Sequence, residues 1–105
     1  MQRPTVMILT ALAGGSAHGY AIKQEVENLS QTGEVLRVGT LYAALDRLTQ
    51  EGLVEVDREE LVDSRLRRYY KLTSQGRTEL EAQAKADAAR SRLALRRLKA
   101  HGVGA

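Results

Sequence analysis

Cysteine, phenylalanine and tryptophan are missing from this 105-residue sequence, and each absence limits the chemistry that the chain can support. Without cysteine there is no disulfide framework, no thiolate nucleophile and no cysteine metal site, and nothing in the sequence indicates export. Without phenylalanine and tryptophan the core must be mainly aliphatic, and an aromatic-walled pocket for a small molecule would have few walls. The sequence supplies four tyrosines instead, Tyr20, Tyr42, Tyr69 and Tyr70.

Long apolar runs are also missing. None approaches the roughly 18 residues that a membrane span needs, so we expect no membrane partner. The N-terminus, with Arg3, an apolar run at 6–9 and Ala11-Leu12-Ala13, loosely imitates a signal peptide. Its apolar run is short and its basic region is a single arginine, so we interpret it as part of the fold and expect a cytoplasmic protein. The length indicates one domain, which buries roughly 60–70% of its unfolded surface.

A catalytic or metal site cannot be assembled from the residues present. No nucleophile has a neighbouring base, no set of His, Cys and carboxylates has metal-ligand spacing, and there is no phosphate-binding loop. His18 stands without a second ligand or a nucleophile, so we interpret it as a capping or packing residue. We therefore expect neither an enzyme nor a protein that requires a metal or a cofactor.

The net charge of +3 is too small to indicate nucleic-acid binding by itself, but it is unevenly distributed. Residues 73–105 hold seven basic and three acidic side chains and so carry +4, which leaves −1 for residues 1–72. Near the end of that first part, an acidic stretch precedes a basic one: Glu55, Asp57, Glu59 and Glu60 come before Arg65, Arg67, Arg68 and Lys71. If the two stretches pair as strands, part of the positive charge is neutralised across the hairpin.

An amphipathic helix is predicted at about residues 40–50. Apolar side chains recur there at i, i+3, i+4 and i+7 and so share one helix face: Leu41, Ala44, Leu45 and Leu48. We predict Thr40 as its N-cap and Gly52 as the residue that ends it. The opposite face is small at its centre, at Ala43, and polar at its edges. A DNA major groove fits such a face best, although any amphipathic surface helix also has a polar side.

The remaining elements complete the order of a winged helix-turn-helix. We predict helices over 4–13 and about 19–30, with a turn at 31–34 and a short edge strand at 35–38 between the second and the third helix. After the third helix come a strand at 53–56, a charged link, and a strand at 66–72, in which Arg68 must reach a carboxylate or solvent. The fold class is mainly α (α+β): a winged helix-turn-helix at 1–72, followed by a C-terminal helix and tail at 73–105.

The last helix is predicted to run from an N-cap at Thr73 to about Ala100, ended by His101-Gly102. At 1.5 Å per residue it spans roughly 42 Å, which is longer than so small a domain needs. The first helix is apolar nearly all round, and we predict that the two helices join two copies of the chain. The predicted dimer interface consists of Val6, Leu9, Leu12, Leu80, Leu93, Leu95 and Leu98. The alternative is that the far end is a solvated or DNA-grazing basic tail.

Four motifs follow one another at a specific spacing within roughly residues 5–100. They are His18-Gly19-Tyr20; Gly39-Thr40-Leu41-Tyr42 with Leu45 and Leu48; Glu51-Gly52-Leu53; and Arg68-Tyr69-Tyr70-Lys71-Leu72-Thr73 followed by Gly76. With these motifs the chain closely resembles the PadR family of bacterial transcriptional regulators, specifically the short subfamily with one C-terminal helix. The resemblance implies a homodimer joined by that helix, a recognition helix in the major groove, and a wing that reaches the DNA backbone or minor groove. It also implies a repressor, in some members released by small phenolic or flat aromatic ligands.

The sequence departs from the family pattern in two places. The predicted wing tip reads Leu61-Val62-Asp63-Ser64, where Gly/Pro-rich tips are usual, so the pattern leaves the length of the wing open. The last helix has no aromatic residue, whereas short members that bind drugs are similar to one another in stacking them on an aromatic there. This second departure argues against a planar drug as the effector.

We predict a dimeric DNA-binding repressor whose two recognition helices meet half-sites about 34–36 Å apart in a palindromic operator. The residues predicted to contact bases in the major groove are Thr40, Tyr42, Ala43 and Arg47. Those predicted to contact phosphates are His18, Tyr20, Lys23, Arg65 and Arg67. A second interpretation stays open, a winged-helix protein–protein module without DNA binding, because the acidic first wing strand would repel phosphate.

Overall fold

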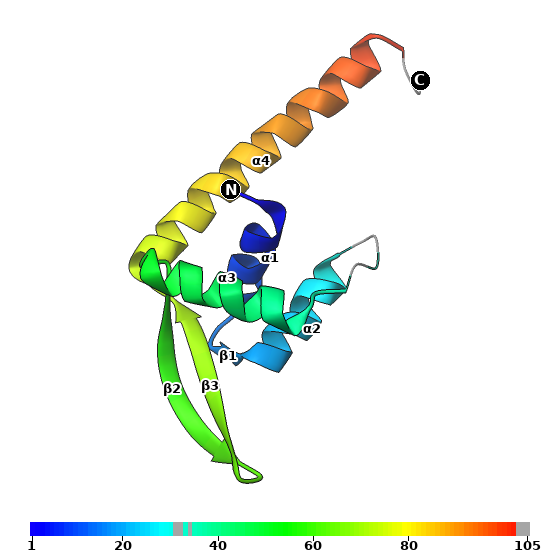
Figure 1. Ribbon diagram of the computed structural model, residues 1–105. Helices are drawn as coiled ribbons and strands as arrows, with labels where there is room; N and C mark the ends of the chain where they lie inside the picture. The colour runs from blue at the N-terminus through cyan, green and yellow to red at the C-terminus, as the bar shows by residue number, and fades with distance from the viewer. Residues whose placement is uncertain (31–32, 34, 103–105) are drawn as a thin grey trace.

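Figure 1 shows the architecture of the protein in a computed structural model, which describes residues 1–30, 33 and 35–102. Three helices, α1 (Arg3–Ala13), α2 (Gly19–Leu29) and α3 (Val38–Gln50), pack together beside a long hairpin of β2 (Val54–Val62) and β3 (Arg65–Leu72). A two-residue strand, β1 (Ala17–His18), pairs with β3, and the long helix α4 (Ser74–Ala100) leaves the globule. The predicted mainly α winged helix-turn-helix with a long last helix is confirmed.

The core lies between the three short helices and the base of the hairpin. As the sequence predicts, it is aliphatic apart from one tyrosine; its members are Ile8, Leu9, Leu12, Ile22, Val26, Leu41, Leu45, Leu48, Leu53, Val54, Tyr70 and Leu72. The leucines at the i, i+4 and i+7 positions of α3 are all buried, which confirms the predicted apolar face. Each fully buried leucine stabilises the fold by roughly 1.5–3 kcal/mol, so this cluster fixes how α3 is presented.

Two local predictions about the start of α3 are wrong. The N-cap is Arg37 and not Thr40, because the helix begins three residues earlier than that cap implies, at Val38. Residues 35–37 form no strand, and the short strand lies at Ala17–His18, where the backbone passes close enough to β3 to pair with it. A two-residue strand has no periodicity of its own, so only this tertiary contact defines it. Of the predicted turn at 31–34, residues 31, 32 and 34 lie outside the described part of the chain.

The hairpin is longer than the predicted strand at 53–56 suggests. Strand β2 continues through its charged residues to Val62, because those side chains are exposed and pair across the hairpin with β3. The link is only Asp63 and Ser64, with φ values of 51° and 63°. Two consecutive positive φ angles are the mark of a type I′ turn, the tight connection that matches the twist of the two strands. We call this hairpin, residues 54–72, the wing.

Close packing fixes the start of α4 against the end of α3. Thr73 caps α4, as predicted: its Oγ1 accepts a hydrogen bond from the backbone N–H of Gly76 at 3.0 Å. The same hydroxyl donates to the carbonyl of Gly52, whose φ of +79° favours glycine where α3 ends. Gly76 lies directly against the Leu53 carbonyl, and any Cβ there would collide with it. Two of the sequence motifs therefore form a single junction.

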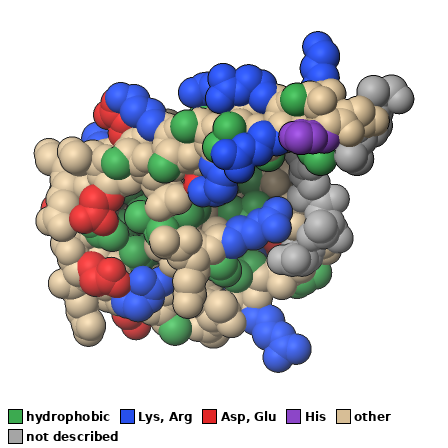
Figure 2. Space-filling view, turned by 90° about the horizontal axis from the view of Figure 1, so that it is seen from above, with side chains coloured by type: hydrophobic (Ala, Val, Ile, Leu, Met, Phe, Trp, Pro, Cys, Tyr) green, Lys and Arg blue, Asp and Glu red, His purple; other side chains and the backbone are tan. Residues whose placement is uncertain are grey.

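Beyond this junction α4 projects from the globule, so that the molecule measures 60 × 29 × 20 Å along its principal axes. The helix ends at Ala100, with Gly102 at a φ of +70°, as predicted. Residues 88–100 are all exposed, and Figure 2 shows basic side chains along the projecting part. In the described part of the chain, no helix has both the length and the apolar character that a membrane crossing requires.

Candidate nucleic-acid interface

A broad groove of about 860 Å³ lies between the wing and the two helices α2 and α3. Three separate parts of the chain line it: the start of α2, the outer face of α3, and the tip half of the wing. Its lining includes five of the predicted contact residues, which are His18, Tyr20, Tyr42, Arg65 and Arg67. The fold thus brings together side chains that are almost 50 positions apart in the sequence.

His18 caps α2 and also faces the groove. Its Nδ1 accepts a hydrogen bond from the backbone N–H of Ala21 at 3.3 Å, which confirms the predicted capping role. Its ring meets Tyr69 of β3 edge-on, with 5.4 Å between the ring centroids. Burial and the nearby Arg67 guanidinium lower the pKa of His18 below its usual value. The imidazole is therefore held neutral with its proton on Nε2, and that N–H is the donor left for a partner.

The glycine that follows His18 leaves room for Tyr42 of α3. A Cβ at this position would collide with the hydroxyl end of the Tyr42 ring. The start of α2 and the outer face of α3 therefore meet through one glycine–tyrosine contact, which joins the first two motifs. Tyr42 is 42% exposed and Tyr20 is 63% exposed, so both side chains are accessible to a partner that lies in the groove. The hydroxyl of Tyr20 accepts a hydrogen bond from Gln24 at 3.2 Å.

The outer face of α3 is open to solvent along the groove. Thr40 and Ala43 are exposed, as their positions in the helical pattern predict. Asp46, one turn beyond Tyr42, also lines the groove and is absent from the predicted contact residues. Helical spacing identifies it, since it shares the outer face of α3 with Ala43. A carboxylate can accept a hydrogen bond from the N4 amino group of cytosine, so Asp46 belongs among the candidates.

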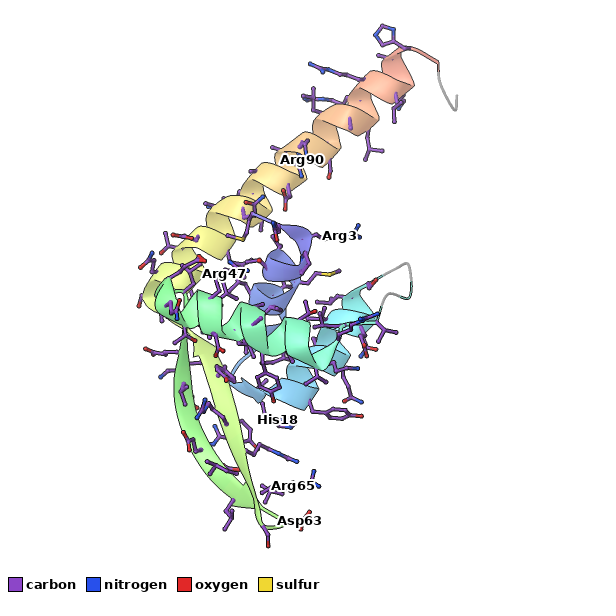
Figure 3. All side chains as sticks on the ribbon, in the orientation of Figure 1. Arg3, His18, Arg47, Asp63, Arg65 and Arg90 are labelled. Carbon is purple, nitrogen blue, oxygen red and sulfur yellow. The ribbon has the colours of Figure 1, made fainter. Side chains whose placement is uncertain are left out.

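Arg47 does not join this group. It lies at the other end of α3, and Figure 3 shows it on the side of α1 and α4, away from His18 and Arg65. One guanidinium nitrogen bonds Glu51 at 2.9 Å and the other donates to the buried Thr5 hydroxyl of α1 at 2.8 Å. Its role in base contact stays a prediction, and in the structure Arg47 ties α3 to α1.

Lys23 is also engaged within the chain. Its ammonium lies 2.9 Å from the carboxylate of Glu27, and only 21% of its side chain is exposed. The same Glu27 carboxylate accepts the backbone N–H of Leu36 at 2.9 Å, so it ties α2 to the segment before α3. The Lys23 and Leu36 hydrogen bonds lower the pKa of Glu27. A phosphate would therefore compete with a carboxylate for Lys23.

The basic residues of the wing fall into two groups. Those nearer its base are paired: Arg68 with Glu59 at 3.4 Å, and Lys71 with Glu55 at 3.6 Å and Asp57 at 3.5 Å. The predicted pairing across the hairpin is thus confirmed, and Arg68 reaches a carboxylate. Arg65 and Arg67, nearer the tip, form no ion pair within the described residues. Positive charge without a partner therefore gathers where the wing borders the groove.

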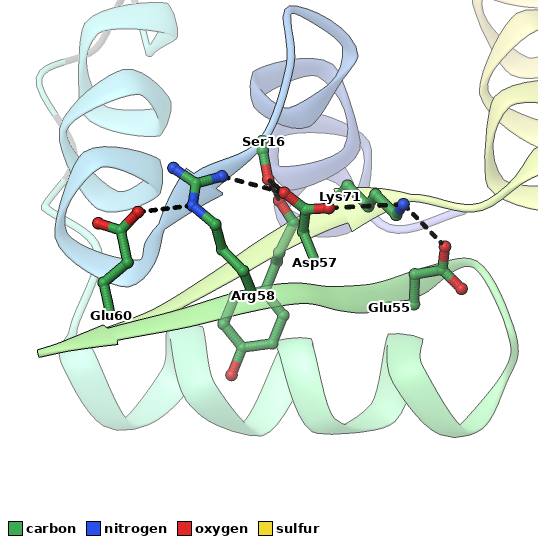
Figure 4. Close-up of polar contacts among 7 residues, drawn as sticks. Ser16, Glu55, Asp57, Arg58, Glu60 and Lys71 are labelled. Atoms are coloured by element: carbon green, nitrogen blue, oxygen red, sulfur yellow. Dashed lines mark hydrogen bonds and ion pairs between the residues drawn. The ribbon is translucent and has the colours of Figure 1, made fainter. Parts of the chain in front are cut away.

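A cluster of polar contacts joins the wing to Ser16, just before β1, as Figure 4 shows. The pairing register of β2 with β3 shifts between Val56 and Arg58, so Asp57 is the extra residue of a bulge. The Ser16 hydroxyl donates to Asp57 at 2.7 Å, and this bond, with help from Arg58 and Lys71, lowers the pKa of Asp57. Arg58 in turn lies 4.0 Å above the Tyr69 ring. The cluster orients the wing relative to α2, and no periodic pattern in the sequence reveals it.

The residues predicted for a dimer interface are of three kinds in the structure: buried, half-buried and exposed. Leu9 and Leu12 are completely buried in the chain's own core, so they have no surface to give a partner. The apolar character of α1 reflects intramolecular packing on several sides. Val6 and Leu80 are half-buried, and Leu80 packs against the core. Leu93, Leu95 and Leu98, at 37%, 67% and 49% exposure, are the predicted interface residues that remain accessible on α4.

The described residues contain no group of three or more His, Cys, Asp or Glu side chains that could hold a metal ion.

Comparisons with known proteins agree with this geometry. The model of the transcriptional regulator PadR-like family matches residues 8–82. The transcriptional regulator Rv3488 of Mycobacterium tuberculosis is 41% identical over 73 residues, which cover 70% of this chain and 64% of that protein. An uncharacterised protein of Lysinibacillus sphaericus is 31% identical over 74 residues, 70% of this chain and 68% of its own length. The chain therefore spans about two thirds of these two relatives.

Two solved structures show the same fold. A PadR family transcription regulator from Clostridium difficile superposes with a TM-score of 0.76 at 25% identity, over 90% of this chain and 96% of that one. Bacillus subtilis PadR in complex with operator DNA gives a TM-score of 0.70 at 24% identity, over 79% of this chain and 47% of that one.

Proposed function

Because this chain belongs to the PadR-like family of transcriptional regulators, we propose that it is a homodimeric repressor that binds a palindromic operator. The observation that carries the proposal is the groove, in which the open face of α3 lies beside two arginines, Arg65 and Arg67, that form no ion pair with any residue the structure describes. A helix with a small, exposed outer face can enter a major groove, and a flanking basic wing can neutralise phosphates.

In this proposal α3 reads bases and its neighbours hold the backbone. Ala43 allows close approach, Thr40 and Tyr42 offer hydroxyl groups, and Asp46 offers an acceptor for cytosine. The contacts to phosphate come from the His18 Nε2–H, the Tyr20 hydroxyl and the two wing arginines, Arg65 and Arg67. Arg47 and Lys23 contribute through positioning, since both have partners within the chain.

The homodimer is proposed to form through α4. The exposed leucines of α4 and its projection from the globule support a second copy as their partner. Two-fold symmetry then sets two copies of α3 against two half-sites about one helical turn apart, roughly 34–36 Å. A small-molecule effector stays a prediction of the family resemblance. A planar drug is not proposed, because α4 carries no aromatic ring to stack on it.

Binding to the DNA upstream of the chain's own gene and of its neighbours tests the function. We expect protection of an inverted repeat, and an affinity that falls steeply as salt rises, because arginine–phosphate contacts release counterions. A scrambled duplex of the same composition is the control for specificity. If no duplex is bound with a salt-dependent affinity, the repressor proposal fails and the protein–protein module replaces it. The acidic residues of β2 are the feature that favours that second function.

A further inference from the structure

Two large apolar side chains stand exposed near the tip of the wing. Leu61 of β2 and Leu66 of β3 are directly opposite one another in the hairpin register, and they are 75% and 64% exposed. Only four residues separate them in the sequence, and the tight turn at Asp63 and Ser64 lies between them. Because residues opposite one another in a hairpin share a face, the two side chains form one apolar pair.

The core of the chain does not reach this pair. The buried part of β3 ends at Tyr70, four residues from Leu66, which is roughly 13 Å along a strand. An exposed apolar pair on a protruding hairpin is a liability for aggregation unless a partner uses it. Leu66 lines the same groove as Tyr42 and His18, so it faces the partner that contacts α3.

The charges around the pair indicate which partner that is. Arg65 and Arg67 flank Leu66 in the sequence and form no ion pair within the described residues, although Arg67 lies opposite Glu60 in the hairpin register and helps to lower the pKa of that carboxyl. Glu59 and Glu60 form their ion pairs with Arg68 and Arg58. The only unpaired acidic side chain of the tip half of the wing, within the described residues, is Asp63, in the turn itself. An apolar pair on one face of a wing tip whose other face carries Arg65 and Arg67 suits a duplex, whose phosphates border a groove floored by base edges and sugars.

We propose that Leu61 and Leu66 form a wedge that enters the minor groove beside the half-site and opens a base step there. This inference rests on the proposed operator binding and adds how the flank of the operator is selected. The minor groove is only about 6 Å wide, so apolar side chains can enter it but a whole hairpin cannot. Such wedges unstack a step and bend the duplex, which costs least at flexible pyrimidine–purine steps such as TA and CA. The wing thus selects sequence through the deformability of the DNA, and Arg65 and Arg67, on the opposite face of β3, contact phosphates at the edge of the groove.

The test replaces the pair with Leu61→Thr and Leu66→Thr together, which keeps the β propensity and removes the apolar ends. The control is Leu61→Ile with Leu66→Ile, which keeps both properties. We expect the threonine variant to fold like wild type by thermal melting and to lose at least about tenfold in operator affinity, equivalent to about 1.4 kcal/mol. It should also lose the preference for TA over a stiff A-tract at the flank, and the operator bend measured by energy transfer should decrease. The isoleucine variant should retain all three.

The outcomes separate the wedge from the repressor function. Suppose that the wild-type chain binds its operator and that the threonine variant shows the same affinity, bend and flank preference. This result would overturn the wedge and leave the repressor proposal intact. A threonine variant with altered sedimentation would also overturn it, because a second copy would then be what covers the pair. A wild-type chain that binds no DNA would overturn the repressor proposal itself, and the wedge with it. The slope of affinity against salt should stay unchanged in the threonine variant, since no phosphate contact is removed.

Discussion

Arg47 illustrates how a single contact changes the interpretation of a recognition helix. On the helical pattern alone it belongs to the outer face of α3, yet its guanidinium donates to Thr5 and pairs with Glu51. We expect Arg47→Ala to reduce the free energy of unfolding by about 0.5–1.5 kcal/mol, the usual net value of one hydrogen bond, and to leave operator affinity nearly unchanged. Thermal melting and fluorescence anisotropy measure the two effects.

The matched variant is Thr5→Val, which removes the same bond from the α1 side while keeping the shape of the side chain. Arg47→Ala and Thr5→Val should be strongly non-additive in the double mutant, because they delete one interaction. A loss of operator affinity in Arg47→Ala without any change in stability would instead restore Arg47 to the base contacts.

His18 gives the protein a dependence of stability on pH. Burial and Arg67 lower the pKa of His18 in the folded chain, so the unfolded chain takes up the proton at a higher pH. The resulting stabilisation is therefore complete above the ordinary histidine pKa of about 6.5, and it is lost as pH falls from there through the lower folded value. Asparagine also caps helices but does not titrate, so His18→Asn should weaken the dependence of the melting temperature on pH between about 7 and 5. An identical pH profile in the two proteins would contradict the assignment.

At the scale of elements, the wing combines a neutralised base with a charged tip. Arg65 and Arg67 have no ion-pair partners in the described residues, so we expect Arg65→Ala with Arg67→Ala to weaken binding to any duplex while preserving base preference. The slope of log affinity against log salt should become shallower by about one unit per lost phosphate contact. Titration of operator and scrambled duplexes at several salt concentrations measures both quantities.

The control removes the same amount of charge from cations that already have partners. Lys71 pairs with Glu55 and Asp57, and Lys85 pairs with Glu81 at 2.8 Å. Lys71→Ala with Lys85→Ala should change the salt slope much less than the wing-tip pair does. Equal slopes for the two double variants would mean that only net charge matters and that the wing tip does not meet phosphate.

For the molecule as a whole, the second half of α4 stands apart, because residues 88–100 are all exposed. Burying a leucine contributes roughly 1.5–3 kcal/mol, so Leu93, Leu95 and Leu98 of two chains could hold a dimer together. We expect Leu95→Asp with Leu98→Asp to sediment as a monomer and to lose operator binding. Its globule should keep its helical signal, because the core of α1, α2 and α3 does not use these residues.

Two further variants of the chain test whether the end of α4 holds the dimer together. A chain ended after Ala89 should also be monomeric, and if it stays dimeric and binds the operator as well as the parent, the role assigned to the end of α4 is wrong. Leu61→Asp with Leu66→Asp makes the same chemical change on the wing tip. This variant should remain dimeric. That result would show that dissociation of the dimer depends on where the leucines lie and not on how many are replaced.

The elements that depend on local periodicity and on special residues could be predicted from the sequence alone. The leucine spacing of α3, the threonine cap of α4 and the glycine that ends α3 each act over a few residues, so their patterns are readable without a fold. The four motifs added the family and, with it, the winged helix-turn-helix. The boundaries that were wrong, at Thr40 and at residues 35–38, lie where no such local signal exists.

Which partners a side chain has within the chain became visible in the three-dimensional structure alone. Charge and helical phase predict Arg47 and Lys23 as contact residues, and the structure adds that Thr5 and Glu51 bind Arg47 and that Glu27 binds Lys23. Apolar character made Leu9 and Leu12 resemble interface residues, but the chain's own core encloses them. Availability depends on neighbours that come from distant parts of the chain, and a pattern that spans a few residues carries no information about them.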